Sequence, residues 1–397
     1  MTDSNSNLDD GKRYTSQRVN SIAPSGIRKF FDLLATMDNV ISLGVGEPDY
    51  STPWNIREAA IFSLEQGKTM YTSNSGMLEL RQELSRHLEQ SYGVTYDPRS
   101  ELLITVGVSE ALDLAMRATI DPGDQVLMAA PCYVAYPASV LLSSGEPIMI
   151  PTFEKDSFEL SPADVSMAIT NRTKAILSGY PLNPTGAVLP REKMQKIADI
   201  ACQHNMLVMS DEIYASLVYG VQHTCFASLP GMRSRTILMG GFSKSYAMTG
   251  WRIGYAAGPR EIIAAMTKIH QYSIMCAPTM AQVAALEALR NGANKVAEMV
   301  SDYNHRRKMF VKGLRDIGLS CFEPKGAFYA FPNITITGMT AEAFAEKLLA
   351  EERVAVVPGT AFGACGEGYV RCCYATAISE LEEALKRIKR FVERYRK

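Results

Sequence analysis

The stretch GGFSKSYAMTGWRIGY, residues 240–255, contains an unusually placed lysine. It follows residues 236–239, whose β-branched and apolar side chains predict a buried strand. A lysine normally lies on a solvated face beside other charges, whereas Lys244 has glycines, hydroxyls and aromatics as its neighbours. We therefore expect Lys244 to be partly desolvated, which lowers the pKa of an amine and makes it a nucleophile for Schiff-base chemistry.

The same stretch also carries an arginine, Arg252. Its guanidinium group is a fixed, forked cation that suits a phosphate. A lysine for an aldehyde and an arginine for a phosphate together suggest pyridoxal 5'-phosphate (PLP). The rest of the chain is then expected to supply the other contacts of this cofactor.

The composition is that of an ordinary globular protein, with 397 residues of which 47% are apolar and 21% charged. This length accommodates two domains. The formal net charge of −1 argues against a nucleic-acid partner, because there is no basic excess to neutralise phosphates. No run of 18 apolar residues occurs, so we expect no membrane-spanning helix.

The cysteines and histidines do not form a metal-binding pattern. Eight cysteines are scattered without a CxxC pair, and none of the five histidines is spaced as a ligand. We expect no metal site and reduced thiols. Residues 1–17, MTDSNSNLDDGKRYTSQ, lack the apolar core of a secretory signal. These features predict a cytoplasmic protein whose residues 1–15 are disordered.

Predicted strands alternate with helices through the first two thirds of the chain, which indicates a parallel, doubly wound α/β sheet. Open sheets of this kind bind ligands at the C-terminal ends of their strands. Polar residues follow the predicted strands at that edge: Ser109, Tyr133, Asn183, Asp211 and Lys244. Each is a weak signal alone, but together they predict a binding site.

One of these positions has a structural alternative. Gly107-Val108-Ser109 joins a predicted strand at 102–106 to a helix predicted from Glu110 to Ala118. The free N–H groups of a helix N-terminus bind anions, so Ser109 would either hold a phosphate oxygen or simply cap the helix. Glu110 favours the helix dipole but has to point away from a bound anion.

Residues 44–49, GVGEPD, resemble the first half of a dinucleotide-binding fingerprint. Asp49 stands where the third glycine belongs, and Pro48 prevents a helix from opening where a pyrophosphate would need it. A nicotinamide-binding site is therefore disfavoured.

The pattern changes towards the C-terminus. Helices are predicted over 282–290, 295–314, 341–349 and 378–395, with strands over 326–331, 354–357 and 369–374. A helix over 27–34 and a strand over 40–43 are predicted near the N-terminus. We expect a large α/β domain over 46–285, and a smaller α+β domain built from 16–45 and 286–397.

Four motifs occur in order along the chain: PLNPTG at 181–186, SDEIY at 210–214, SKSYAMTGWRIGY at 243–255 and GEGYVRCCYAT at 366–376. With them, the sequence from Ile22 to the C-terminal helix resembles the class I and II aminotransferases of PLP fold type I, in particular the aspartate and aromatic aminotransferase subgroup. The resemblance implies transfer of an amino group from an L-amino acid to a 2-oxo acid through PLP in a ping-pong reaction.

The resemblance also implies roles at the cofactor ring. Lys244 would carry PLP as a Schiff base and shuttle a proton during catalysis. Asp211 would pair with the pyridine nitrogen and keep it protonated, so that the ring accepts electrons. Tyr214 and Asn183 would donate hydrogen bonds to the phenolate oxygen of the ring, and Tyr133 would stack on its face.

Further roles concern the phosphate. It would be held by side chains and backbone of this chain: Arg252, Ser243 and the backbone of Gly107, Val108 and Ser109. Tyr71 matches the family tyrosine that reaches the phosphate of the neighbouring subunit. This match implies a homodimer with shared active sites.

Arg371 would bind the α-carboxylate of the substrate bidentately, with the backbone of Gly46 and Asn183 nearby. Taken alone, Asp211 also fits a helix cap, Tyr133 a core aromatic, Arg371 a surface ion pair, and Tyr71 a surface residue. Their occurrence together favours the functional interpretation.

Two departures from the family pattern bear on the substrate. Gly241 stands where many relatives have Ser or Thr, which leaves Ser243 as the hydroxyl for the phosphate. Ser109 stands where aspartate-preferring relatives often have a basic residue, which weakens the case for a dicarboxylic donor. The apolar side chains of residues 22–27 would suit an aromatic or aliphatic substrate group.

Two other functions are alternatives to amino-group transfer. A PLP-dependent C–S β-lyase of the same fold would release pyruvate without an oxo-acid acceptor, and only the likeness to aminotransferases disfavours it. A PLP-binding transcription regulator would need a basic DNA-binding domain before the fold, and about 20 polar residues do not make one.

Overall fold

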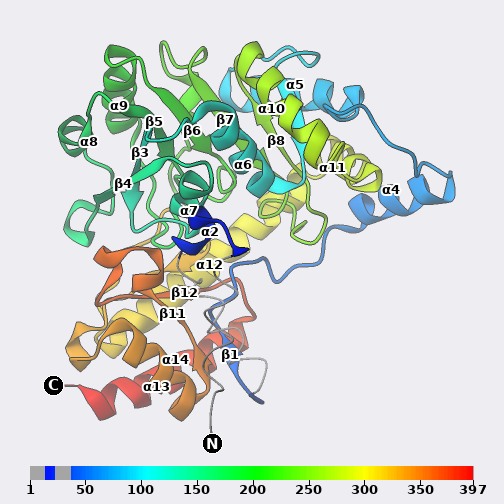
Figure 1. Cartoon of the computed structure of the whole chain (residues 1–397). Helices are drawn as coiled ribbons and strands as arrows, with labels where there is room; N and C mark the ends of the chain where they lie inside the picture. Colours follow the sequence, from blue (N-terminus) through cyan, green and yellow to red (C-terminus); the bar gives the residue numbers. More distant parts are fainter. Residues whose placement is uncertain (1–13, 23–36, 397) are drawn as a thin grey trace, which may run out of the picture.

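The computed structural model of the chain describes residues 14–22 and 37–396 (Figure 1). The disorder predicted for residues 1–15 lies outside this range, apart from residues 14 and 15. The helix predicted over 27–34 and most of the apolar segment 22–27 also lie outside the described residues.

A seven-stranded sheet forms the larger part of the fold and confirms the predicted α/β class. Its strand order is β2-β8-β7-β6-β5-β3-β4. Only β8 runs antiparallel to its neighbours, and the other pairings are parallel. The strands are β2 (Leu102–Thr105), β3 (Gln125–Ala130), β4 (Glu146–Pro151), β5 (Thr173–Ser178), β6 (Leu207–Asp211), β7 (Thr236–Gly241) and β8 (Gly254–Ala257).

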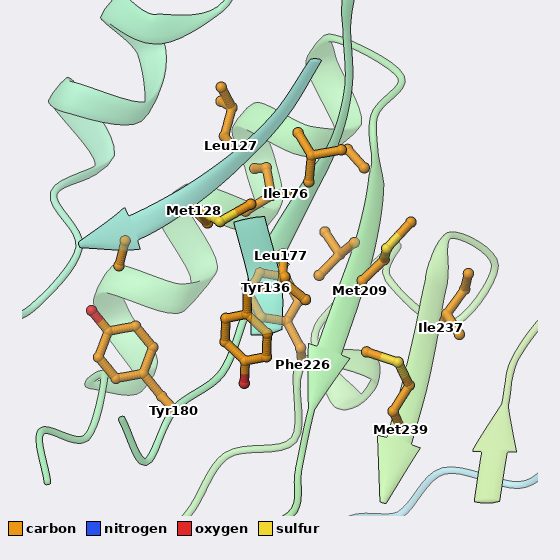
Figure 2. Close-up of a cluster of buried hydrophobic side chains, with 14 of the residues drawn as sticks. Leu127, Met128, Tyr136, Ile176, Leu177, Tyr180, Met209, Phe226, Ile237 and Met239 are labelled. Atoms are coloured by element: carbon orange, nitrogen blue, oxygen red, sulfur yellow. The ribbon is translucent and has the colours of Figure 1, made fainter. Parts of the chain in front are cut away.

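Both faces of this sheet are buried, as expected for a mostly parallel sheet. Successive side chains of a strand point to opposite faces, and on β7 Leu238 joins one apolar cluster while Ile237 and Met239 join another. Figure 2 shows part of the second cluster, where side chains of β3, β5, β6 and β7 gather with Tyr136 and Phe226.

Helices flank the sheet (Figure 1). α6 packs on β7 and β8, α10 packs on α6, and α11 packs on α4 and α5. The helices are α4 (Trp54–Glu65), α5 (Leu78–Tyr92), α6 (Gly107–Thr119), α7 (Ala135–Leu142), α8 (Pro162–Ala168), α9 (Arg191–Gln203), α10 (Arg260–Ser273) and α11 (Thr279–Asn291).

A second body of structure brings the two ends of the chain together. β1 pairs in parallel with β10, and β11, β12 and β9 form an antiparallel sheet. α13 packs on β10 and β11, and α14 packs on β10, α12 and α13, around a separate apolar cluster. The elements are β1 (Ile41–Ser42), α12 (Ala293–Ile317), β9 (Tyr329–Ala330), α13 (Ala341–Glu352), β10 (Val354–Ala355), β11 (Val357–Pro358), β12 (Val370–Cys373) and α14 (Ile378–Tyr395).

Two predicted strands of this region are shorter than expected. The strand predicted over 326–331 is confined to β9, because Ala327 has a left-handed backbone (φ 56°) that interrupts an extended chain. The strand predicted over 354–357 divides at Val356 into β10 and β11, which belong to different sheets.

The domain boundaries at 45/46 and 285/286 remain predictions. α11 runs across the second of them, and α2 (Gln17–Asn20) packs against α7 through Arg18, whose Nη1 donates to Leu142 O at 3.3 Å. Among the described residues, no helix is both long enough and apolar enough to cross a membrane. The eight cysteines are free thiols.

Candidate active site

A cavity of about 540 Å³ lies where the C-terminal ends of the strands meet the second body of structure. Eleven of the predicted site residues line it: Gly46, Val108, Ser109, Tyr133, Asn183, Asp211, Tyr214, Ser243, Lys244, Arg252 and Arg371. These residues come from segments more than 300 positions apart in sequence, so the fold gathers what the chain separates.

Lys244 follows β7 and projects into this cavity. Its Nζ donates a hydrogen bond to the backbone oxygen of Gly46 at 2.7 Å. No carboxylate within the described residues forms an ion pair with it. Burial lowers the pKa of Lys244 to about 8. A substantial fraction of this amine is therefore neutral and nucleophilic near neutral pH.

Asp211 is the last residue of β6 and is buried. Its Oδ2 accepts a hydrogen bond from the hydroxyl of Tyr136 at 2.9 Å, and its Oδ1 accepts one from the backbone N–H of Ile213 at 3.1 Å. Burial raises the pKa of Asp211 to about 6, while these two hydrogen bonds lower it. The carboxylate is thus oriented and mostly ionised at neutral pH.

Tyr214 and Tyr329 form a pair of buried hydroxyls. Their oxygen atoms lie 2.7 Å apart, and burial raises the pKa of both phenols well above the usual range. Neutral phenols are hydrogen-bond donors. Tyr329 also packs closely against Gly46, where a side chain would not fit, because a Cβ at Gly46 would lie 2.5 Å from the Tyr329 hydroxyl oxygen.

Arg371 lies on β12 and is only 4% exposed. Its Nη1 donates to Asn183 Oδ1 at 3.0 Å, and its Nη2 donates to Gly44 O at 2.5 Å. Its Cζ lies 4.6 Å from the ring centroid of Tyr329 and 4.9 Å from that of Phe362, so the guanidinium is held between two aromatic rings. Nε is buried and has no hydrogen-bond partner among residues 14–22 and 37–396.

The presumed phosphate end of the cavity is formed by α6 and Arg252. α6 begins at Gly107, earlier than the predicted start at Glu110, because Gly107 adopts φ 73° and turns the chain directly from strand to helix. A Cβ there would also lie 2.7 Å from Nη2 of Arg252. The capping role considered for Ser109 is therefore wrong, since Val106 is the N-cap residue.

Two tyrosines differ in their placement. The ring of Tyr133 lines the cavity and meets Tyr136 edge-on at 5.5 Å. Tyr71 is 79% exposed and does not line the cavity of its own chain.

Sequence reasoning missed three aromatic residues of the site. Tyr136 orients Asp211, and Tyr329 and Phe362 enclose Arg371. A signal existed for Tyr136, which lies three positions after Tyr133 just beyond a buried strand. Nothing in the sequence distinguishes Tyr329 and Phe362 from ordinary core aromatics.

The donor and acceptor set of this cavity fits PLP. A poised amine suits an aldehyde, a buried carboxylate suits a pyridinium nitrogen, and a guanidinium beside a helix N-terminus suits a phosphate. The free Nε of Arg371 leaves a further donor for an acidic substrate. No group of His, Cys, Asp and Glu within the described residues is arranged to hold a metal ion.

Comparisons with known proteins agree with a PLP site in this cavity. Residues 38–388 match the family "Aminotransferase class I and II". The Bacillus subtilis protein YugH is 54% identical over 96% of this chain and 99% of its own length. The aspartate aminotransferase of Pyrococcus abyssi is 44% identical over 94% of this chain and 97% of its own length.

A solved structure gives the same result. The aromatic aminotransferase from Pyrococcus horikoshii superimposes with a TM-score of 0.88 at 43% identity, covering 92% of this chain and 99% of that one. Members of this family depend on PLP. The chain therefore belongs to the class I and II aminotransferases and is a PLP-dependent aminotransferase of fold type I.

Proposed function

We propose that this protein moves the amino group of an L-amino acid to a 2-oxo acid with Lys244, Asp211 and Arg371 in distinct roles. The observation that carries the proposal is that one cavity holds an amine with a lowered pKa and a guanidinium with an unpartnered donor. The first group can exchange protons, while the second can fix a substrate carboxylate beside it.

When bound, PLP supplies an aldehyde that takes up the amino group and a ring that accepts electrons from the substrate α-carbon. Lys244 Nζ is the base for this reaction. In its neutral form it would remove the proton from the substrate α-carbon, and in its charged form it would deliver that proton to the C4′ carbon of the cofactor. A pKa of about 8 gives both forms useful populations near neutral pH.

Asp211 keeps the ring nitrogen protonated through a charge-assisted hydrogen bond. Tyr136 and the N–H of Ile213 hold the carboxylate in place for this contact. Tyr214 and Asn183 would donate hydrogen bonds to the phenolate oxygen of the ring. The hydroxyl of Tyr214 is held in place for this contact by the hydroxyl of Tyr329.

The phosphate is assigned to Arg252, Ser243 and the N–H groups at the start of α6. The exposed Tyr71 is assigned to the phosphate of a second subunit, which makes the protein a homodimer with shared active sites. Its 79% exposure in the isolated chain supports this role, because a tyrosine that reaches a partner does not pack on its own chain. A cytoplasmic location belongs to the same proposal.

The substrate α-carboxylate is assigned to Arg371, together with Gly46 and Asn183. The cations that line the cavity within residues 14–22 and 37–396 are Lys244, Arg252 and Arg371, and each already has a role. Among these described residues no lining cation remains for a second carboxylate, and Ser109 offers only a hydroxyl. We therefore propose an aromatic or aliphatic amino donor.

The test is a half-reaction on the purified holoenzyme. Each amino acid is added alone, and the visible absorption band of the bound cofactor is followed. Phenylalanine should bleach the band, and 2-oxoglutarate should restore it. Release of pyruvate and ammonia from cysteine over many turnovers, without an added oxo acid, would contradict amino-group transfer. A strong preference for aspartate over phenylalanine would contradict the proposed donor class but leave the transfer reaction standing.

A further inference from the structure

Glu110 brings a negative charge close to the presumed phosphate site. It is the fourth residue of α6 and directly follows Ser109, which lines the cavity. The N–H groups of the first turn have no partners within the helix and attract anions. A carboxylate in that turn competes for the same N–H groups and repels a phosphate through a short distance of low-dielectric protein.

The Glu110 carboxylate is held by two groups, one from the residue before α6 and one from α10. Oε2 accepts the backbone N–H of Val106 at 2.5 Å, and Oε1 lies 2.7 Å from Nδ1 of His270. The carboxylate only accepts when ionised, so Nδ1 is the donor of this contact. Val106 is the N-cap residue, so the N–H group that Glu110 binds lies just outside the helix. The Glu110 carboxylate therefore does not occupy the N–H groups of Gly107, Val108 and Ser109.

Within the described part of the chain, the imidazole of His270 has no polar contact other than the one with Glu110. It lies in the last turn of α10, which packs on α6, and is fully buried. Its Nε2 is also buried and has no hydrogen-bond partner in the described part of the chain. A buried polar group without a hydrogen bond destabilises the folded state. A buried histidine with only one hydrogen bond is therefore expected where that hydrogen bond has a function.

We propose that His270 is a positioning residue for the phosphate end of the active site, acting through Glu110. It holds the carboxylate against Val106, so that the first-turn N–H groups of α6 face the anion without competition. This inference rests on the proposed function, since it takes the anion to be the phosphate of PLP. It assigns a role to a buried pair that touches neither the cofactor ring nor the substrate.

The test measures binding to the apoprotein rather than turnover. His270→Phe fills the same space without a donor, whereas His270→Asn keeps a donor near the Nδ1 position. Dissociation constants are measured for PLP, for inorganic phosphate and for pyridoxal, which lacks the phosphate. His270→Phe should weaken PLP and phosphate binding about three- to tenfold and leave pyridoxal binding unchanged. His270→Asn should stay within about twofold of the parent protein.

Removing the negative charge of Glu110 should strengthen phosphate binding, the opposite of the effect of His270→Phe. Glu110→Gln keeps an oxygen for the N–H of Val106 but carries no charge, so it should tighten phosphate binding about two- to fivefold. In that background His270→Phe should change phosphate binding by less than about twofold. His223→Phe is the matched control, because it breaks another buried contact of a histidine with a glutamate, Glu212, away from α6. It should leave the dissociation constant of inorganic phosphate unchanged.

Three results would overturn the inference. One is a parent-like affinity for phosphate in His270→Phe, another is an equal loss of pyridoxal binding, and the third is a double variant as weak as His270→Phe alone. Each of these leaves the proposed function intact if the parent apoprotein binds PLP. A parent apoprotein that binds no PLP would overturn the proposed function together with this inference.

Discussion

The two ends of the active site are built in opposite ways. At the sheet edge, Lys244 is partly buried and Asp211 is buried, both have few partners, and their pKa values are shifted to about 8 and about 6. At the other end, Arg371 is held by a backbone oxygen, an amide oxygen and two aromatic rings. The group that exchanges protons, Lys244, has a pKa close to neutral pH, whereas the group that binds the substrate, Arg371, is kept rigid.

This difference has a physical reason. A proton-transfer group works best when its two protonation states are close in free energy, and burial brings an amine or a carboxyl towards that condition. A binding group gains most when it is already oriented, because less conformational freedom is lost on binding. Changes at the sheet edge should therefore alter rates and pH profiles, while changes at the clamp should alter affinity.

The largest effect is expected for Lys244→Ala. Because this variant lacks the base and the nucleophile of the cavity, turnover should fall by about 10⁴-fold or more. Binding of PLP through its phosphate should persist, since the α6 and Arg252 contacts are unchanged. Both are measured on one preparation, by steady-state assay and by PLP titration.

Lys295→Ala is the matched control, because this exposed lysine pairs only with Glu298 on α12. It should retain parental activity. Full activity in Lys244→Ala would refute the central assignment.

Asp211→Asn should lower kcat about 10²- to 10³-fold, because a neutral amide stabilises a protonated ring nitrogen far less than a carboxylate does. It should also change the pH dependence of apoprotein stability. The pKa of Asp211 is raised from its ordinary value near 4 to about 6, so the folded state holds this proton more tightly than the unfolded chain does. That stabilisation is present below about pH 4 and is lost as pH rises to about 6.

Urea denaturation of the two apoproteins between pH 4 and 8 measures this term. Asp211→Asn should show a flatter profile than the parent over that range. Asp316→Asn, at an exposed aspartate of α12 that pairs with Lys312, should keep the parental profile. Equal slopes in the parent and Asp211→Asn would show that the pKa of Asp211 is not raised.

Arg371→Lys tests the rigid end. A lysine keeps the charge but loses the forked geometry, the ring contacts and the Nε donor. KM for the amino donor should rise about 10- to 100-fold, while PLP affinity and the pH profile of kcat stay near parental values. Arg394→Lys, on the exposed face of α14, is the control. A shifted pH profile would mean that the two ends of the site are not separable.

The sheet edge was also the part that sequence reasoning could predict. Asp211 ends one buried strand and Lys244 lies three residues beyond another. Parallel strands end at one edge of a sheet, so local pattern and fold class together place both residues. The clamp depends on contacts between distant segments: Arg371 meets Gly44, more than 300 positions away, and is enclosed by Tyr329 and Phe362. An aromatic residue beside a cation has the same local pattern as one in an apolar core.

The start of α6 shows a second limit of sequence reasoning. The sequence predicts a helix from Glu110, with Ser109 either as its cap or as a phosphate ligand. The chain instead turns at Gly107, whose φ of 73° and close approach to Arg252 are properties of the folded backbone. Glycine signals that such a turn is allowed, but the position of the turn is decided by what packs against it.

Tyr329→Phe gives the smallest expected effect and tests the boundary between the two ends. The ring of Tyr329 packs on Arg371, whereas its hydroxyl contacts Tyr214. Phenylalanine keeps the ring and removes the hydroxyl, so KM should change less than about twofold while kcat falls about threefold to tenfold. Tyr374→Phe removes the hydroxyl of another buried tyrosine, bonded to Ala327 O at 3.2 Å. Each of the two variants loses one buried hydroxyl, so their losses of stability should be similar, but Tyr374→Phe should leave kcat unchanged. If Tyr329→Phe instead raised KM and left kcat unchanged, the hydroxyl would belong to the binding end, and the division of the site would have to be redrawn between Tyr214 and Tyr329.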